Sequence, residues 1–269
     1  MGLVPEHFTL PWHAVAAGGG SSIPPLEPVE QSGGTGQMTA ALAAGELDLA
    51  VLLTEGAVAA VDAGLAATPV RLYQTTPLYW GVHTAGGRVG ELDELWDGRF
   101  AVSRHGSGSH LMAHVLAHRH GRVLDDTDFV VVGDLAGARA ALASGAAALF
   151  LWDRYMTAPL VRSGEFRLVG EQPTPWPALV VTVADRVLIE RGDEIAAVLD
   201  AVDVAARRFC DDPTSVDTVV DRYGLDRATA AAWWERVRLS CDRPVTASLV
   251  AEVRAALGRV GALATTPDG

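Results

Sequence analysis

The chain lacks lysine and asparagine altogether, so all 21 of its basic residues are arginines. Without lysine, the protein cannot form the Schiff base of a pyridoxal phosphate enzyme or of a lysine-dependent aldolase, and it has no lysine for a nucleotide-binding phosphate loop. Without asparagine, N-glycosylation has no acceptor. We predict that the protein uses no cofactor.

Cysteine is scarce, and positive charge is in deficit. Cys210 and Cys241 have neither the spacing of a metal site nor that of a disulfide framework, and we expect both to be buried or incidental. The formal net charge of −12 argues against nucleic acid as a partner, because the phosphate backbone requires a basic patch.

Long apolar runs are also missing, so we expect no membrane span. No charged-then-apolar leader is present, and the sequence as written predicts a cytoplasmic protein. Residues 1–4 resemble the end of a first strand, which leaves open that upstream residues, and with them a leader, have been lost. With 269 residues, 49% of them hydrophobic and 20% charged, the chain suits a folded protein of one large or two modest domains.

The most informative segment is Ser103–His110, where an apolar run turns through glycines into a helical pattern. Arg99–Val102 precedes it as a predicted strand, and Leu111–His118 follows as a predicted helix. Such a turn leaves backbone N–H groups unpaired and directs the positive end of the helix dipole at whatever binds there. The pattern therefore predicts an anion site, although a serine before a helix also serves as a simple N-cap.

Three further junctions deliver the chain into predicted helices. They are Pro5-Glu6-His7, Gly33-Gly34-Thr35-Gly36-Gln37 and Thr54-Glu55-Gly56. In an open α/β sheet the carboxyl ends of the strands line the ligand crevice, so the four junctions together predict one shared site.

Acidic and histidine side chains near these junctions have two interpretations each. Glu6, Glu55 and Asp153 either meet a cationic ligand group or act as bases, or they only complement helix dipoles. His7 and His83 lie beside proposed site elements, where an imidazole binds ligand or moves protons, but a lone histidine is more often surface or core.

A histidine series runs through the predicted helix. His110, His114 and His118 fall four residues apart on one face. A straight helix rises about 12 Å over eight residues, so one metal ion cannot bind all three, and no acidic or thiol partner is evident. We predict no metal site and a solvated polar stripe of which only His110 reaches the ligand.

An internal echo suggests two lobes of the same build. Ala40–Gly45 precedes the predicted strand 47–53, and Ala140–Gly145 precedes the predicted strand 147–152, each as a helix, a glycine stop and a buried strand. Chance similarity between alanine-rich helices is the alternative.

Two extended segments, 71–84 and 176–184, are the natural crossings between lobes. Residues 193–263 then carry helical signals, including Val237 and Leu239, and the tandem Trp233 and Trp234 are typical of core packing.

Together these motifs resemble the type 2 periplasmic-binding-protein fold, in its cytosolic, leaderless branch. The residues that carry the resemblance are Pro5-Glu6-His7, Gly34-Thr35-Gly36-Gln37, Leu53-Thr54-Glu55-Gly56, Thr76-Pro77-Leu78, Trp80-Gly81-Val82-His83, Ser103-Arg104, Gly106 to His110, Leu151-Trp152-Asp153 and Pro173-Thr174-Pro175-Trp176-Pro177. The fold is shared by substrate-binding proteins of ABC transporters and is related to that of thiamine-pyrimidine-precursor binding proteins and synthases. The chain has neither the cysteine-rich motif nor a lysine of those synthases, so their chemistry is not expected here.

The resemblance implies an α/β fold of two lobes, each with a mixed five-stranded sheet, joined by a two-strand hinge around a central cleft. Lobe 1 would comprise residues 1–78 and 182–269, and lobe 2 residues 79–181. The implied function is binding of a small, anionic and partly cyclic or aromatic molecule in the cleft between the lobes. A transporter or a biosynthetic partner stays unidentified at this stage.

The predicted ligand-binding residues come from the four junctions and from three tryptophans that would cap the ligand. They are Pro5, Glu6, His7, Thr35, Gly36, Gln37, Thr54, Glu55, Trp80, Ser103, Gly106, Ser107, Gly108, Ser109, His110, Trp152, Asp153 and Trp176. The alternative is an enzyme on the same scaffold, similar to chorismate dehydratase, which would use His7, Glu55, His110 and Asp153 for acid–base steps. A purely structural module would leave the glycine junctions without a purpose.

Overall fold

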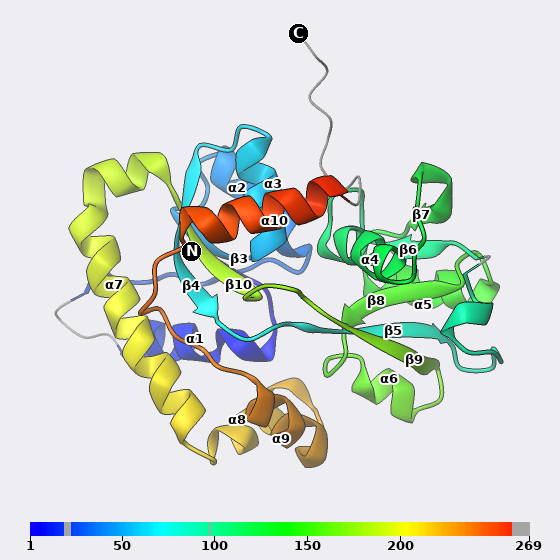
Figure 1. The fold of residues 1–269 in the computed structure, drawn as a ribbon. Helices are drawn as coiled ribbons and strands as arrows, with labels where there is room; N and C mark the ends of the chain where they lie inside the picture. The colour runs from blue at the N-terminus through cyan, green and yellow to red at the C-terminus, as the bar shows by residue number, and fades with distance from the viewer. Residues whose placement is uncertain (19–22, 97, 260–269) are drawn as a thin grey trace, which may run out of the picture. The chain divides into compact units, whose positions relative to one another are not determined.

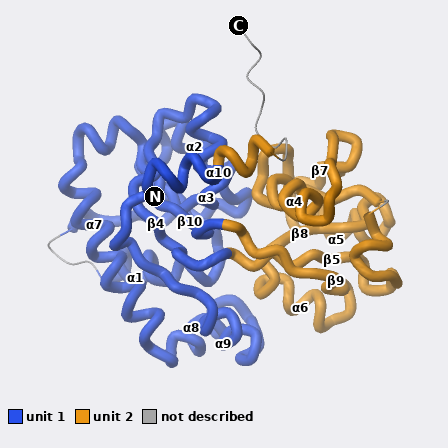
Figure 2. The backbone as a smooth tube through the Cα atoms, in the orientation of Figure 1, with its two compact units in different colours: residues 1–77, 176–253 blue, residues 78–175, 254–269 orange. Residues whose placement is uncertain are grey.

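The computed structural model describes residues 1–18, 23–96 and 98–259, and its helices and strands are drawn in Figure 1. They form two compact units, coloured separately in Figure 2. Unit 1 consists of residues 1–77 and 176–253, and unit 2 consists of residues 78–175 together with the chain from residue 254 onward. The chain therefore passes from one unit to the other after Pro77, after Pro175 and after Val253.

Unit 1 is built on a five-stranded mixed sheet. Across the sheet, its strands are β2 (Val29–Glu30), β1 (Gly2–Leu3), β3 (Leu49–Leu53), β10 (Leu179–Ala184) and β4 (Ala67–Gln74). β1 is parallel to β2 and β3, whereas β10 is antiparallel to β3 and β4. The helical elements that begin and end in this unit are η1 (His7–Thr9), α1 (Leu10–Gly18), α2 (Gly34–Ala43), α3 (Thr54–Asp62), α7 (Asp185–Asp211), α8 (Ser215–Tyr223) and α9 (Arg227–Arg236).

Unit 2 repeats this arrangement with different segments. Across its sheet, the strands are β7 (Phe129–Val131), β6 (Phe100–Val102), β8 (Leu149–Asp153), β5 (Tyr79–Ala85) and β9 (Phe166–Pro173). β6 is parallel to β7 and β8, and β5 is antiparallel to β8 and β9. Its helical elements are η2 (Leu92–Glu94), α4 (Gly108–Arg119), η3 (Asp126–Asp128), α5 (Leu135–Ser144) and α6 (Ala158–Arg162), and α10 (Ala247–Arg259) includes the division between the units.

The prediction of an α/β fold with two mixed five-stranded sheets is confirmed. In both sheets a parallel group of three strands, each followed by a helix, is extended by a fourth strand that runs antiparallel to the group. The fifth strand is antiparallel to the fourth, and the strand order is the same in both sheets. The echo at an offset of one hundred residues has the same origin, because α2 and α5 are equivalent, as are β3 and β8. Gly45 and Gly145, which follow these two helices, have φ angles of +75° and +76°, a conformation that glycine adopts without strain.

The sheets and helices pack through small and aliphatic side chains. In unit 2, α5 contributes Ala138, Ala141 and Leu142 to a buried cluster with Phe150 and Phe166 of the sheet. The alanines allow the helix to approach the sheet closely, and the larger strand side chains fill the space between them. The alanines of α5 thus allow close packing in addition to favouring a helix.

From residue 185 to residue 259 the chain is mostly helical, as expected, but one stretch is not. Residues 260–263 of the predicted helical region lie outside the described residues. Val237 is an extended residue that ends α9, and Leu239 forms a β-bridge with Gln74. Residues 238–245 run antiparallel along β4, with hydrogen bonds such as Leu72 N to Arg243 O at 2.9 Å. The predicted helical role of Val237 and Leu239 is therefore wrong: their hydrophobicity serves to cover the open edge of the sheet.

The remaining tryptophan and cysteine expectations concern this same region. Trp233 is buried at 3% exposure, which confirms core packing, while Trp234 is half-buried and donates to Phe209 O. Cys241 is buried, Cys210 is half-buried, and both are free thiols.

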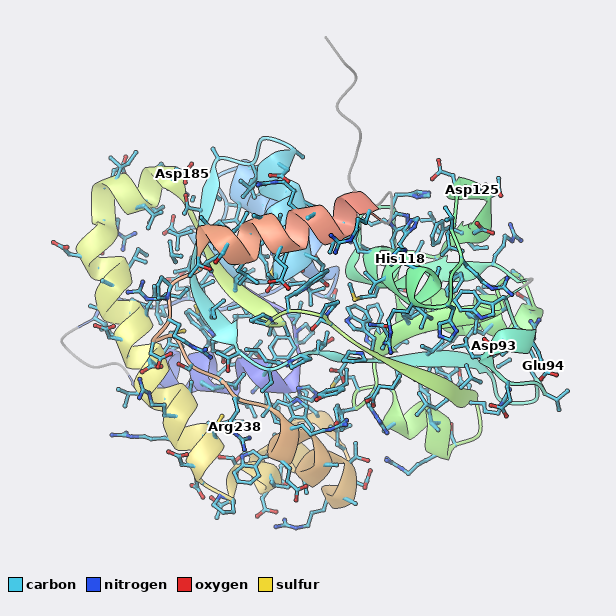
Figure 3. All side chains as sticks on the ribbon, in the orientation of Figure 1. Asp93, Glu94, His118, Asp125, Asp185 and Arg238 are labelled. Carbon is cyan, nitrogen blue, oxygen red and sulfur yellow. The ribbon has the colours of Figure 1, made fainter. Side chains whose placement is uncertain are left out.

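Asp185, labelled at the start of α7 in Figure 3, accepts a hydrogen bond from Thr68 at 2.7 Å and so links α7 to β4.

Candidate functional site

Three of the predicted junctions lie at one edge of the unit 1 sheet. β2, β1 and β3 are neighbouring parallel strands, and each is followed by a helical element that begins within a few residues. Because parallel strands end at the same edge, the segments around Glu6, Thr35 and Glu55 are brought to one side of this sheet. Helix α2 begins at Gly34, earlier than predicted, so Thr35, Gly36 and Gln37 lie in its first turn.

The start of α3 is held closely against the start of α2. The hydroxyl of Thr35 accepts a hydrogen bond from Leu53 N at 3.2 Å. A Cβ on Gly56 would lie only 2.5 Å from Cγ2 of Thr35. The glycine in the Thr54-Glu55-Gly56 motif is thus required by close packing between two helix N-termini.

Glu55 is the most unusual acidic residue of this edge. Its side chain is 0% exposed, and Oε2 accepts a hydrogen bond from Nε1 of Trp176 at 2.8 Å. Oε1 is buried and has no hydrogen-bond partner among the described residues. Burial raises the pKa of Glu55 to about 7, and the bond from Trp176 opposes that rise only in part. Such a carboxyl group changes its charge near neutral pH, as binding and acid–base residues do.

Thr54 fixes the chain segment that carries Trp176. Its hydroxyl donates to Pro177 O at 2.5 Å, and its amide donates to Ala178 O at 3.0 Å. The contact between Trp176 and Glu55 therefore joins the start of α3 to a segment more than a hundred residues away in the sequence.

The other predicted residues of unit 1 are placed less favourably for a polar role. His7 is fully buried, and its ring lies 4.0 Å from that of Trp233, measured between centroids. Glu6 uses its backbone oxygen to accept from Tyr223 at 2.8 Å. The side-chain oxygen of Gln37 accepts from Gly33 N at 2.8 Å. Pro5 is half-buried in the same segment.

In unit 2, the glycine–serine turn is the N-terminal cap of α4. Ser107 is the N-cap, and its hydroxyl accepts from His110 N at 3.4 Å and contacts the hydroxyl of Ser109 at 3.1 Å. Ser109 in turn accepts from Ser103 N at 3.3 Å. The capping interpretation of Ser107 is confirmed. Gly108 and Ser109 are the first two helical residues, whose amides have no acceptor inside a helix, so the turn keeps donors for an anion.

Gly106 and Arg104 contribute to the shape and the charge of this turn. Gly106 has a φ of +74°, the left-handed conformation that closes the turn, and its amide donates to Nδ1 of His110 at 3.1 Å. Arg104, absent from the predicted site, is half-buried in the same turn, and burial lowers the pKa of its guanidinium. A basic side chain directly after a strand, among glycines and serines, was the signal in the sequence.

The histidines of α4 do not form a solvated stripe. His110 and His114 are both buried, with their Nε2 atoms 3.4 Å apart, whereas His118, labelled in Figure 3, is exposed. The prediction is wrong for His114 because α4 packs this face against Phe129. Burial, with the nearby His114 and His105, lowers the pKa of His110 to about 4, so His110 is neutral at pH 7. Within the described ranges, no three histidine, cysteine or acidic side chains are grouped to hold a metal.

The end of β8 carries Asp153, opposite Trp80 of β5. Oδ1 of Asp153 accepts from Tyr155 N at 2.8 Å and from Met156 N at 2.9 Å, so this carboxylate caps the turn that leads to α6. Trp80 is buried, whereas Trp152 is half-buried and stacks on Phe150 within the α5 cluster.

His83 has a structural environment. It is fully buried, and its ring nitrogens lie 3.3 Å from Phe150 O and 2.9 Å from the hydroxyl of Thr157. Burial lowers its pKa to about 4. A neutral imidazole bonded on both sides is a core histidine, as the alternative interpretation expected.

The sequence analysis did not identify two buried glutamine side chains, those of Gln74 and Gln172. Gln74 ends β4, and Gln172 lies near the end of the equivalent strand β9. Gln172 accepts from Arg119 at 2.6 Å, and Gln74 donates to Pro77 O at 3.1 Å. An amide at or near the end of a strand, just before each crossing between the units, was the only available signal.

Comparison with known proteins identifies the fold. A family model described as Ca3427-like PBP matches residues 80–172. The chain is similar to the CA3427 gene product of Candida albicans, described as defining a family with the generic periplasmic binding protein fold, with 24% identity and a TM-score of 0.91 over 99% of this chain and 91% of that chain. No curated protein is a significant match to the sequence.

Two sulfonate-binding proteins are also similar in structure. The alkanesulfonate-binding protein SsuA of Xanthomonas axonopodis pv. citri, bound to MOPS, has 18% identity and a TM-score of 0.82 over 98% of this chain and 93% of that chain. The aliphatic sulphonate-binding protein SsuA of Escherichia coli has 18% identity and a TM-score of 0.70 over 98% of this chain and 89% of that chain. The chain therefore has the type 2 periplasmic-binding-protein fold. In the described part of the chain, no helix is both long and apolar enough to cross a membrane.

Proposed function

We propose that this chain, which has the type 2 periplasmic-binding-protein fold, binds a small organic anion, partly cyclic or aromatic, whose acidic group lies at the start of α4. The observation that carries the proposal is the Ser103–Ser109 turn, where a glycine-rich loop delivers two unbonded helix amides beside two buried serine hydroxyls and Arg104. That the ligand is held between the two lobes stays a prediction of the resemblance.

The chemistry of the turn favours an anion over a neutral ligand. The helix dipole places partial positive charge at the first amides of α4, and Arg104 adds a full charge in the same turn. His110 accepts a hydrogen bond through Nδ1 and is neutral at pH 7, so it adds no positive charge to that of Arg104 and the helix dipole. The protein has a formal net charge of −12, so an anion needs such a local site to overcome the overall repulsion.

Similar structures point to the class of anion. Two of them are described as sulfonate-binding proteins, one of them bound to MOPS, a ring compound with a sulfonate group. A tetrahedral or planar oxyanion suits adjacent backbone amides equally well, so carboxylates and phosphates belong in the same test. The proposal covers both a protein that serves uptake by a transporter and one that serves a biosynthetic route.

The first prediction concerns Ser109. Replacing Ser109 with Asp puts a negative charge beside the first amides of α4, and we expect it to abolish binding of MOPS or a related sulfonate in isothermal titration calorimetry. Ser109→Ala removes one hydroxyl, and should weaken binding about three- to tenfold if the hydroxyl contributes one neutral hydrogen bond. Ser163→Asp, an exposed position of the same unit, is the matched control for charge and should leave binding unchanged. Equal affinity in the wild type and in Ser109→Asp would refute this site.

An enzyme on the same scaffold is the second candidate, and the pKa of Glu55 at about 7 is the observation that favours it. The two functions differ in what Glu55→Gln does. In a binding protein the substitution changes affinity, and the ligand is recovered unchanged. In an enzyme it lowers turnover by about 10²- to 10⁴-fold with a smaller effect on binding. Mass spectrometry of the ligand before and after incubation distinguishes them.

A further inference from the structure

Unit 1 contains a surface cavity that takes no part in the proposed function. Its volume is about 630 Å³, within the range typical of small-molecule sites. Helices α1, α7 and α8 form its walls, and Figure 1 shows α1 beside α7, with α8 following α7 in the chain. All of its lining residues belong to unit 1. We call this cavity the α1–α7 groove.

The walls of the α1–α7 groove are mainly apolar. On α7 the lining residues recur every three or four positions, which is the spacing of one helix face. From Ala201 to Phe209 this row extends about 12 Å along the helix axis. Val204, within the row, is 50% exposed, so apolar surface is left uncovered there. The main apolar side chains of the groove are Leu10, Ala14, Val15, Val204, Ala205 and Phe209.

Small side chains create the space in the groove. Ala14 of α1 faces it from one wall, and Ala201 and Ala205 of α7 face it from another. Beside the alanines of α5, phenylalanines of the sheet fill the corresponding space, whereas no described side chain fills the α1–α7 groove. The groove therefore has room for an elongated apolar group.

A positive charge without a partner lies in the wall of the groove. No carboxylate of the described residues forms an ion pair with Arg208, whereas the neighbouring Arg207 pairs with Asp203 and Asp242. Asp212 also lines the groove, but its Oδ1 already accepts two hydrogen bonds, from the amide and the hydroxyl of residue 214 at 2.9 and 2.7 Å. The uncompensated charge of the wall is therefore positive, which favours an anionic group on the ligand.

Ser215 adds a hydroxyl to the same end of the groove. The residue lines the groove and is only 8% exposed, and its hydroxyl has no hydrogen-bond partner among the described residues. Such buried polar groups are uncommon. Backbone hydrogen bonds of 3.0 Å join Asp212 to Arg208 and Ser215 to Asp212, so these residues lie together at the corner between α7 and α8. A guanidinium and a hydroxyl at one end of an apolar groove suit a carboxylate with an alkyl chain.

We propose that the α1–α7 groove binds an aliphatic carboxylate, as a second ligand in addition to the anion at the turn of unit 2. Arg208 and the hydroxyl of Ser215 bond to the carboxylate. The alkyl chain lies along α7 past Val204 and Ala205, and contacts Val15 of α1. A chain of about eight to ten carbons matches the length of the row on α7.

Probes of matched length separate the contributions of the chain and the head group. Octanoate, decanoate, 1-octanol and octylammonium are titrated in a calorimeter at pH 7.5, below their micellar concentrations. We expect octanoate to bind with a Kd below about 1 mM, and decanoate to bind about tenfold more tightly because two more methylene groups are buried. 1-Octanol should bind about three- to fivefold more weakly than octanoate, since it has no charge to pair with Arg208, and octylammonium more weakly still.

Removing the charge tests the head group. Arg208→Gln should weaken octanoate binding about three- to fivefold and leave 1-octanol binding unchanged, because Arg208 is exposed and exposed ion pairs are modest. Arg88→Gln is the matched control, since Arg88 is exposed and forms no ion pair with a described residue. This control should bind all four probes as the wild type does.

Filling the groove tests the location. Ala205→Phe places a ring in the space beside Val15, and it should abolish binding of octanoate and of 1-octanol. Ala232→Phe, at an exposed position of α9 outside the groove, is the control for added apolar bulk and should bind as the wild type does. Should Ala205→Phe fail to fold, the comparison of octanoate with 1-octanol on the wild type and on Arg208→Gln still decides the matter.

Several results would overturn the inference. Equal octanoate affinity in the wild type and in Ala205→Phe excludes the groove as the site, and equal affinity in the wild type and in Arg208→Gln excludes recognition of the carboxylate. No binding of decanoate at 1 mM excludes both. A dimer in sedimentation velocity that Ala205→Phe disperses would assign the groove to a second copy of the chain instead.

The same variants separate this inference from the proposed function. Loss of octanoate binding in Ser109→Asp, but not in Ala205→Phe, would place octanoate at the turn of unit 2 and contradict a groove site. Retained binding in Ser109→Asp, with loss in Ala205→Phe, supports the groove whether or not the protein binds MOPS.

Discussion

At the scale of single residues, the two acids at the ends of equivalent strands serve different purposes. Asp153 follows β8, and its Oδ1 caps a turn through two backbone amides. Glu55 follows β3 and meets one indole N–H, with its other oxygen unpaired among the described residues. The sequence placed both acids after buried strands and did not separate them, because at Glu55 the side-chain donor is the indole of Trp176, which is distant in the sequence.

The buried Glu55 should make stability depend on pH. Its pKa in the folded protein is about 7, above the unfolded value of 4.5, so the folded state binds the proton more tightly. The stabilisation is complete below pH 4.5 and is lost as the pH rises through 7. The difference is on the order of 3 kcal/mol of unfolding free energy, from the size of the pKa shift.

We therefore expect Glu55→Gln to stabilise the protein at pH 8 relative to wild type, and to have much less effect at pH 5. Urea denaturation at the two pH values measures the change, and Glu46→Gln provides the exposed control. His83 and His110 impose the opposite slope below about pH 6.5, because burial lowers their pKa values, and they affect the wild type and the variant alike. The same stability difference at both pH values would contradict the burial of an ionisable Glu55.

At the scale of elements, the contact between the first turns of α2 and α3 sets the geometry around Glu55. Gly56 and Thr35 meet there, and the hydroxyl of Thr35 also bonds to the end of β3. The motif Thr54-Glu55-Gly56 was correctly placed at a junction, but the need for glycine comes from Thr35 of α2, which lies outside this motif. Local patterns do not contain that information.

Gly56→Ala should force α2 and α3 apart, because the new methyl group would lie 2.5 Å from Cγ2 of Thr35. We expect a loss of about 1–3 kcal/mol in the free energy of unfolding, typical of overpacking. Thr35→Ser removes the opposing methyl and keeps the hydroxyl, so the double variant should recover most of the loss. Gly258→Ala, at a helical position with open space around it, serves as the control and should be neutral or slightly stabilising. Additive effects of the two substitutions would exclude the proposed contact.

At the scale of the whole molecule, repetition made much of the fold predictable. The two alanine-rich helices that end in glycine, each followed by a buried strand, marked equivalent parts of two sheets, and the sheets do share one strand order. Periodicity failed at Val237 and Leu239, since a short apolar stretch looks the same in a helix and in a strand that covers a sheet edge. It failed again at His114, where helical spacing alone did not tell which side of α4 faces the core.

The candidate site was predictable as a set of junctions and not as a set of contacts. Glycines and serines after strands located the turn at residues 103–109 and the starts of α2 and α3. The capping role of Ser107 was one of the two interpretations that the sequence offered, and Arg104 lies inside the same motif. The bond from Trp176 to Glu55 joins segments that are distant in the sequence, and it arises only when the chain has folded.

Native mass spectrometry of the freshly purified protein tests the central claim most directly, with wild type and Ser109→Asp measured side by side. We predict that the wild type carries a small noncovalent ligand, or takes one up from a panel of organic anions. On release this ligand should ionise as an anion, and the variant should carry none. Identical spectra of the two proteins, without any bound organic anion after incubation with the panel, would contradict the account.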